Sequence, residues 1–181
     1  VASAITVKIG HEINPDFQIG CMLAMVPFYA RTCRPQDEIA AQIAMEHRLY
    51  YYGDLHVFGE YPSFMKAFQK ERGIVLDITK EDLQYLKEGC VDYIGISYYM
   101  SSTISSIETD DSIKVAEGFY VARNPYVEKS DWNWQIDPQG LRYSLNLLHQ
   151  RYHKPIFVVE NGFGAYDKME NGEIHDQYRI K

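Results

Sequence analysis

One acidic residue, Glu160, directly follows the apolar run Ile156–Val159 and precedes Asn161-Gly162. A charged side chain at the end of a hydrophobic strand is costly unless it is hydrogen-bonded or paired. A carboxylate that is held in place can act as a nucleophile or as a base. The same position also fits an ordinary strand-end acid that faces solvent or pairs with an arginine, so Glu160 alone leaves the choice open.

Apolar runs at three places in the chain predict strands that are buried on both faces. The runs are Phe17–Val26, Val91–Tyr99 and Ile156–Glu160. Runs of this kind are typical of parallel sheets, in which helices cover both faces. Active sites of parallel α/β folds collect at the carboxyl ends of the strands. The expected site therefore lies where these runs end.

The segments between these runs predict helices with recognisable start and stop signals. They cover residues 1–9, 35–52, 62–69, 79–89 and 137–152. Gly10 and Gly53-Asp54 are expected to end the first two helices, and Thr79-Lys80-Glu81-Asp82 has the spacing of a capping box. Strands that alternate with helices predict an α/β fold with a parallel sheet and right-handed crossovers.

Two further segments complete the predicted organisation. Met100–Ser130 is rich in Ser, Thr and Asp and is predicted to be a long irregular loop. Tyr178–Lys181 is expected to start another helix. Because three strands cannot close a barrel, residues 1–181 are expected to form a single segment of a domain that is truncated at both ends.

Composition argues against several classes of partner. The net charge is -7 and no run of Lys or Arg occurs, so neither nucleic acid nor a membrane surface is an expected partner. No apolar run approaches the roughly 18 residues of a membrane span, and no signal peptide opens the chain. Cys21, Cys33 and Cys90 are odd in number and widely spaced, which indicates reduced thiols in a cytoplasmic protein.

The histidines fall in helices and loops without ligand spacing, so no metal and no other cofactor is expected. They are His11, His47, His56, His149, His153 and His175.

Several short motifs resemble those of glycoside hydrolase family 1, and they occur in the family's order. They are Phe58-Gly59-Glu60-Tyr61-Pro62, Ile94-Gly95-Ile96-Ser97-Tyr98-Tyr99, Trp132-Asn133-Trp134-Gln135-Ile136-Asp137-Pro138-Gln139-Gly140-Leu141 and Ile156-Phe157-Val158-Val159-Glu160-Asn161-Gly162. Each is weak alone, but together they extend over nearly the whole chain. Val159 replaces the family's usual threonine, and Ser97 replaces its asparagine. The Ser97 variant looks most like bacterial 6-phospho-β-glucosidases.

The resemblance implies a partial (β/α)8 TIM barrel, with about three parallel strands that match the fifth to seventh of the family. Glu160 matches the nucleophile of a retaining mechanism, and Tyr99 matches a tyrosine that hydrogen-bonds this carboxylate and orients it. Tyr98 points the other way along its strand and is expected in the core. Trp132 and Trp134 either line the aglycone side of a substrate cleft or anchor their loop, since indole rings serve both purposes.

The resemblance also implies residues that these 181 positions do not contain. The family's acid/base stands in an Asn-Glu-Pro motif, which does not occur here. Its phosphate-binding Ser, Lys and Tyr follow the eighth strand, beyond Lys181. Glu60 is the other candidate for a catalytic carboxylate, although acidic residues are common near the N-terminus of a helix, where it stands. The chain alone is therefore expected to be inactive.

The expected function is hydrolysis of 6-phospho-β-glucosides, such as phosphorylated cellobiose, salicin or arbutin, in β-glucoside catabolism. One alternative is a non-catalytic barrel fragment that binds sugar or self-associates. Self-association is expected because part of a barrel has unpaired strand edges and uncovered apolar surface. Another alternative is a β-glucosidase of unphosphorylated substrates.

Overall fold

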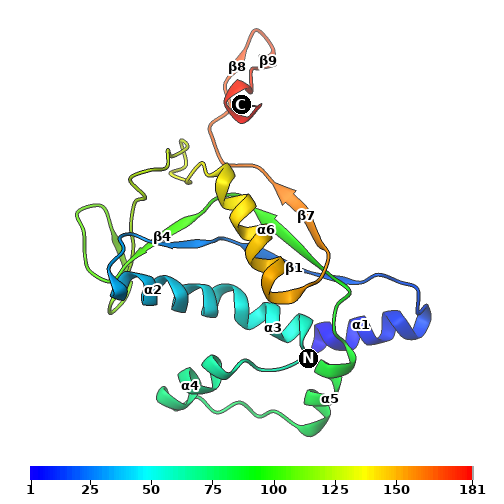
Figure 1. Cartoon of the computed structure of the whole chain (residues 1–181). Helices are drawn as coiled ribbons and strands as arrows, with labels where there is room; N and C mark the ends of the chain where they lie inside the picture. Colours follow the sequence, from blue (N-terminus) through cyan, green and yellow to red (C-terminus); the bar gives the residue numbers. More distant parts are fainter. Residues whose placement is uncertain (181) are drawn as a thin grey trace. The chain divides into compact units, whose positions relative to one another are not determined.

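The computed structural model describes residues 1–180 (Figure 1). These residues form two compact units. Unit 1 consists of Val1–Ala24, Ile43–Ser97 and Leu145–Val159. Unit 2 consists of Met25–Gln42, Tyr98–Ser144 and the described residues from Glu160 onward. The predicted helix at Tyr178–Lys181 is present as α7 (Gln177–Ile180), and Lys181 lies outside the described residues.

A three-stranded parallel sheet contains all three predicted strands, in the order β1-β3-β7. The strands are β1 (Gly20–Met25), β3 (Tyr93–Tyr98) and β7 (Ile156–Asn161). The predicted burial on both faces is confirmed for the central strand β3, where Ile94 and Ile96 are fully buried. It is wrong for the outer strands: Met22 of β1 is 56% exposed and Phe157 of β7 is 59% exposed. Among residues 1–180, each outer strand has a hydrogen-bonded neighbour on one side only.

A second sheet lies in unit 2 and has the order β2-β4-β6-β5. Its strands are β2 (Phe28–Ala30), β4 (Ser102–Ser105), β5 (Ile113–Ala116) and β6 (Phe119–Val121). β2 and β4 are parallel, and the other neighbours are antiparallel. The prediction of one irregular loop over Met100–Ser130 is therefore wrong. Strands of three or four residues are too short to produce a readable alternation of apolar and polar positions.

The first helix, α1 (Ala2–Ile13), continues through the glycine that was expected to end it. A Cβ atom at Gly10 would lie 2.3 Å from Cδ1 of Ile19. The glycine therefore allows close packing inside the helix rather than marking its end.

The long second helix also runs further than predicted. It consists of α2 (Pro35–Met45), a π-helical turn η1 (Glu46–Tyr50) and α3 (Tyr51–Val57), so Gly53-Asp54 lies inside it. A Cβ atom at Gly53 would lie 2.2 Å from the hydroxyl of Tyr152. Close packing again explains a glycine that local propensity alone would interpret as a break.

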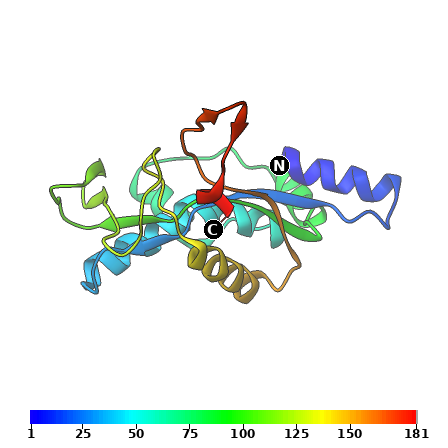
Figure 2. The same cartoon turned by 90° about the horizontal axis from the view of Figure 1, so that it is seen from above.

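Four helices and a small hairpin complete the chain (Figure 2). They are α4 (Ser63–Glu71), α5 (Lys80–Glu88), α6 (Pro138–Tyr152), the hairpin of β8 (Met169–Glu170) and β9 (Glu173–Ile174), and α7. The predicted capping box of α5 is confirmed: Thr79 accepts a bond from the Asp82 amide and the Asp82 carboxylate accepts one from the Thr79 amide. No helix among residues 1–180 is both long and apolar enough to cross a membrane.

A buried carboxylate joins α3 to α6 within unit 1. Asp54 accepts hydrogen bonds from Nε and Nη2 of Arg151 at 2.9 and 2.7 Å, and from the hydroxyl of Tyr152 at 2.9 Å. The guanidinium of Arg151 also lies 4.3 Å from the ring centroid of Tyr50. Burial of Asp54 is tolerated because its charge is paired and both of its oxygens accept hydrogen bonds.

Two glycines with the same φ make a matched stability test. Gly59 and Gly73 both have φ of 63°, but a Cβ at Gly59 would lie 2.3 Å from the carbonyl oxygen of Leu86, whereas Gly73 faces open space. We expect Gly73→Ala to lower the free energy of unfolding by about 1–2 kcal/mol, the cost of left-handed backbone. Gly59→Ala should lower the free energy of unfolding by at least about 1 kcal/mol more than Gly73→Ala, because the backbone carbonyl of Leu86 cannot easily move away from the new Cβ.

Urea unfolding of both variants and the parent chain measures the two losses. Equal losses would show that the contact between Gly59 and α5 contributes nothing to stability.

Candidate active site

The two residues expected to form the catalytic pair meet in unit 2, at the ends of β3 and β7. The hydroxyl of Tyr99 donates a hydrogen bond to Oε2 of Glu160 at 3.1 Å. Tyr99 is 37% exposed and Glu160 is exposed, so the carboxylate faces outward rather than into a core. Glu160 is thus both hydrogen-bonded and accessible, which a nucleophile requires.

A second hydrogen bond fixes the strand ends that carry this pair. Nδ2 of Asn161 donates to the carbonyl oxygen of Tyr98 at 3.1 Å. Each of these residues is the chain neighbour of a member of the pair. The bond between Asn161 and Tyr98 therefore holds the backbones of Glu160 and Tyr99 together without using either functional side chain.

Tyr98 lies in the core of unit 2, as alternation along the strand predicts. It is buried, and its hydroxyl donates to the carbonyl oxygen of Asp137 at 2.5 Å. Asp137 stands directly before α6, and a Cβ atom at Gly140 in the first turn would lie 2.1 Å from the Tyr98 hydroxyl. The motif glycine therefore makes room for the tyrosine that anchors the end of β3.

The hydrogen bond between Tyr99 and Glu160 also shifts the titration of the phenol. It raises the pKa of Tyr99 above its ordinary value, because loss of the proton would remove the donor and set two anions side by side. Tyr99 thus stays protonated at neutral pH and remains a donor to the Glu160 carboxylate.

Aromatic rings pack beside Tyr99, the hydrogen-bond partner of Glu160. The ring centroids of Trp134 and Tyr99 are 5.7 Å apart, and Trp132 packs edge-on against Trp134 at 5.5 Å. Tyr166 extends the cluster, with its centroid 6.2 Å from Trp132. The structure thus brings the two predicted tryptophans to the Glu160 pair. It adds Tyr166, which no motif or spacing identified, because Tyr166 stands in a loop and reaches the cluster only through the tertiary fold.

Hydrogen bonds of Ser130 and Gln135 fix the loop that carries the tryptophans. The hydroxyl oxygen of Ser130 accepts hydrogen bonds from the amides of Trp132 and Trp134, both at 3.3 Å. Farther along the loop, the buried side chain of Gln135 accepts a bond from the hydroxyl of Ser101 at 3.0 Å. Trp132 remains 48% exposed, so the loop presents an indole surface while its backbone is held.

The other carboxylate considered, Glu60, belongs to unit 1 and forms an ion pair with Lys87 of α5. The hydrogen bond from Lys87 lowers the pKa of Glu60 below its ordinary value. The ion pair with Lys87 explains why an acidic residue stands at position 60, just before a helix. Within residues 1–180 no group of three or more His, Cys, Asp or Glu side chains could hold a metal ion.

Titration of Tyr99 tests the electrostatics of the pair. Since the Glu160 carboxylate raises the pKa of Tyr99, Glu160→Gln should move the phenol titration to lower pH. Nuclear magnetic resonance of 13Cζ-labelled tyrosine follows it, with Tyr99→Phe assigning the signal. Glu170→Gln, at an exposed glutamate of β8, is the matched control and should leave the titration unchanged. An unshifted titration in Glu160→Gln would contradict the hydrogen bond.

Comparisons with known proteins agree with this arrangement. Residues 1–181 match glycosyl hydrolase family 1. The chain is 45% identical to the aryl-phospho-β-D-glucosidase BglH of Bacillus subtilis and 44% identical to a 6-phospho-β-glucosidase of Clostridium longisporum, covering 99% and 100% of its own length. It spans only 38% and 39% of the length of those relatives.

A solved structure gives the same result for the fold. The crystal structure of the family 1 β-glucosidase from Exiguobacterium antarcticum superposes with a TM-score of 0.82 at 25% identity, over 99% of this chain and 39% of that one. The three parallel strands are thus part of a TIM-barrel fold, as predicted. With the motif order, the Glu160 pair and the match over its whole length, the chain belongs to glycosyl hydrolase family 1.

Proposed function

We propose that this chain supplies the nucleophile half of the active site of a retaining glycosidase that acts on 6-phospho-β-glucosides. The observation that carries the proposal is the hydrogen bond from Tyr99 to the exposed carboxylate of Glu160. The names of the relatives support the substrate class, since they are phospho-β-glucosidases. On this proposal, residues 1–181 form one segment of a (β/α)8-barrel domain in a cytoplasmic enzyme.

The chemistry assigned to Glu160 is covalent. Its carboxylate attacks the anomeric carbon as the bond to the leaving oxygen breaks, and an acid elsewhere in the site protonates that oxygen. The conjugate base of that acid then deprotonates a water molecule, which attacks the anomeric carbon. This step releases the sugar and restores the Glu160 carboxylate. Tyr99 donates its hydrogen bond to Glu160, orients the attacking oxygen and stabilises the anion before attack.

The second carboxyl group must lie about 5 Å from the nucleophile in a retaining enzyme. In the family it belongs to an Asn-Glu-Pro motif, and these 181 residues contain none. We infer that the chain on its own does not turn over a β-glucoside, because leaving-group protonation lacks its acid.

The aromatic cluster is assigned to the aglycone. Trp132, Trp134 and Tyr166 offer ring surfaces next to the Tyr99–Glu160 pair. Stacking on such surfaces suits the aryl group of phosphorylated salicin or arbutin and the second ring of phosphorylated cellobiose.

A segment exchange tests the nucleophile directly. The matching 38% of BglH is replaced by this chain, and the hybrid is assayed with nitrophenyl 6-phospho-β-glucoside and with its unphosphorylated counterpart. We expect turnover of the phosphorylated substrate, and Glu160→Gln should reduce kcat at least about a thousandfold, as loss of a covalent nucleophile does. Glu60→Gln should stay within about twofold.

The controls separate the parts of the proposal. Full activity of the Glu160→Gln hybrid would exclude Glu160 as nucleophile, whereas preference for the unphosphorylated substrate would remove only the phosphate assignment. The 181-residue chain assayed alone should be inactive. If the isolated chain turned over substrate and Glu160→Gln abolished that turnover, the proposal that activity needs another segment would be refuted.

Self-association of the isolated chain is a separate proposal. The outer strands of the parallel sheet expose Met22 and Phe157, and exposed apolar side chains on open strands favour contact between copies. Light scattering should therefore give a mass above that of one chain, and Phe157→Lys should lower it. A monodisperse monomer of the unsubstituted chain would count against the proposal.

A further inference from the structure

A pair of histidines at the end of α6 plays no part in the proposed chemistry. His149 lies in the last turn of α6 and His153 directly follows the helix. Their ring centroids are 5.9 Å apart, with 77° between the ring planes. Both side chains are exposed and line an open surface cavity of about 520 Å³ in unit 1.

The backbone at His153, the second residue of this pair, has an uncommon conformation. Its φ is 51°, in the left-handed region where non-glycine residues cost roughly 1–2 kcal/mol. Its amide still donates to the carbonyl of His149 at 2.9 Å, which closes the last helical turn. The fold thus holds a residue with a ring where glycine is the ordinary choice, and that ring meets the ring of His149.

The distance between the rings decides what they can bind together. A transition metal lies about 2.0–2.1 Å from an imidazole nitrogen, hence roughly 3.2 Å from the ring centroid, so two rings on one ion lie within about 6.4 Å. The observed 5.9 Å lies within this limit, which applies to nitrogens on opposite sides of the ion; a tetrahedral ion would draw the two exposed rings together to about 5.2 Å. Asn146 precedes His149 by three residues and lines the same cavity, so its amide oxygen is available as a third donor.

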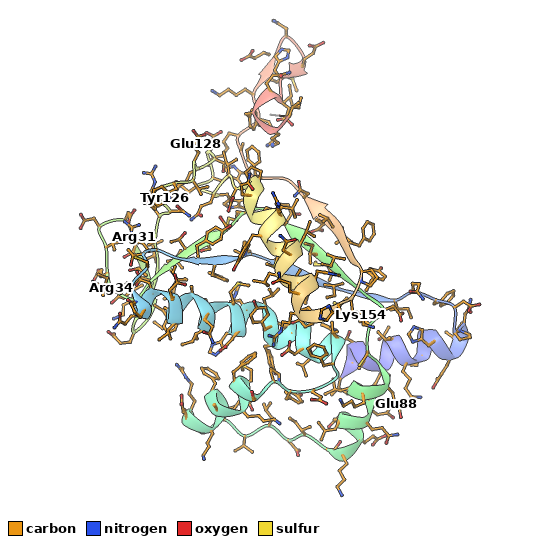
Figure 3. The ribbon with its side chains drawn as sticks, in the orientation of Figure 1. Arg31, Arg34, Glu88, Tyr126, Glu128 and Lys154 are labelled. Carbon is orange, nitrogen blue, oxygen red and sulfur yellow. The ribbon has the colours of Figure 1, made fainter. Side chains whose placement is uncertain are left out.

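The charges around the cavity are compatible with a cation. The carbonyl end of a helix carries partial negative charge, and the cavity stands at that end of α6. Arg151 is engaged elsewhere, with its guanidinium on Asp54. Lys154, labelled in Figure 3 after α6, is a cation in the cavity wall.

We propose that His149 and His153, with Asn146 as a further donor, form a binding site for a divalent transition-metal ion such as Zn²⁺ or Ni²⁺. Imidazole donors select these ions over Mg²⁺ and Ca²⁺, which prefer all-oxygen sites. His149 and His153 stand four positions apart, a ligand spacing on a helix that the expectation of no ligand spacing among the histidines overlooked. The two rings lie side by side at the point where the chain leaves α6 through the left-handed residue His153.

Calorimetric titration of the tag-free chain with ZnCl2 and NiCl2 tests the site. We expect one saturable event, and His149→Gln should weaken it at least about tenfold, as loss of a ligand does. His153→Gly should do the same without unfolding the chain, because glycine suits the left-handed cap. His175→Gln, at an exposed histidine of unit 2, is the matched control and should bind normally.

Resonances of the histidine rings locate the ion in the same samples. Paramagnetic Ni²⁺ should broaden the ring signals of His149 and His153 before those of the other histidines. Zn²⁺ should also raise the midpoint of thermal unfolding in the parent chain and not in His153→Gly, since the ring pair exists only in the folded state. Binding that survives both substitutions, or no saturable binding at all, would overturn the proposal.

Discussion

The hydrogen bond from Tyr99 to Glu160 is the contact on which the candidate site depends. It joins the ends of two neighbouring parallel strands, so backbone pairing brings the two side chains close together. The bond from Asn161 to the Tyr98 carbonyl holds the same strand ends from one residue away. A carboxylate held in this way costs little further ordering when it attacks, because its position is already fixed.

Elements with a long and simple pattern could be predicted from the sequence. The three parallel strands and α6 occur where their apolar patterns indicated, and the capping box at Thr79 has both of its hydrogen bonds. Glu160 and Tyr99 could be identified because each stands at a set position within a motif that ends a predicted strand. Their mutual contact confirms the placement of the two side chains, whereas their catalytic roles remain proposals.

The remaining differences come from tertiary contacts that no local pattern encodes. Gly10 and Gly53 lie inside helices, where Ile19 and Tyr152 pack against them. Local propensity alone predicted that each glycine ends its helix. The short strands of the second sheet are fixed by pairing between distant segments, so Met100–Ser130 resembled a loop. Tyr166 likewise reaches the tryptophans through a loop whose geometry the residue types do not specify.

The central claim is that Glu160 forms the covalent bond to sugar. A 6-phospho-β-glucoside that carries fluorine beside the anomeric carbon and a good leaving group forms the glycosyl ester faster than water removes it. Peptide mass spectrometry of the inactivated hybrid with BglH should find the sugar on the peptide that contains Glu160, and no label in Glu160→Gln. A label on any other carboxylate, with Glu160 unmodified, would contradict the account.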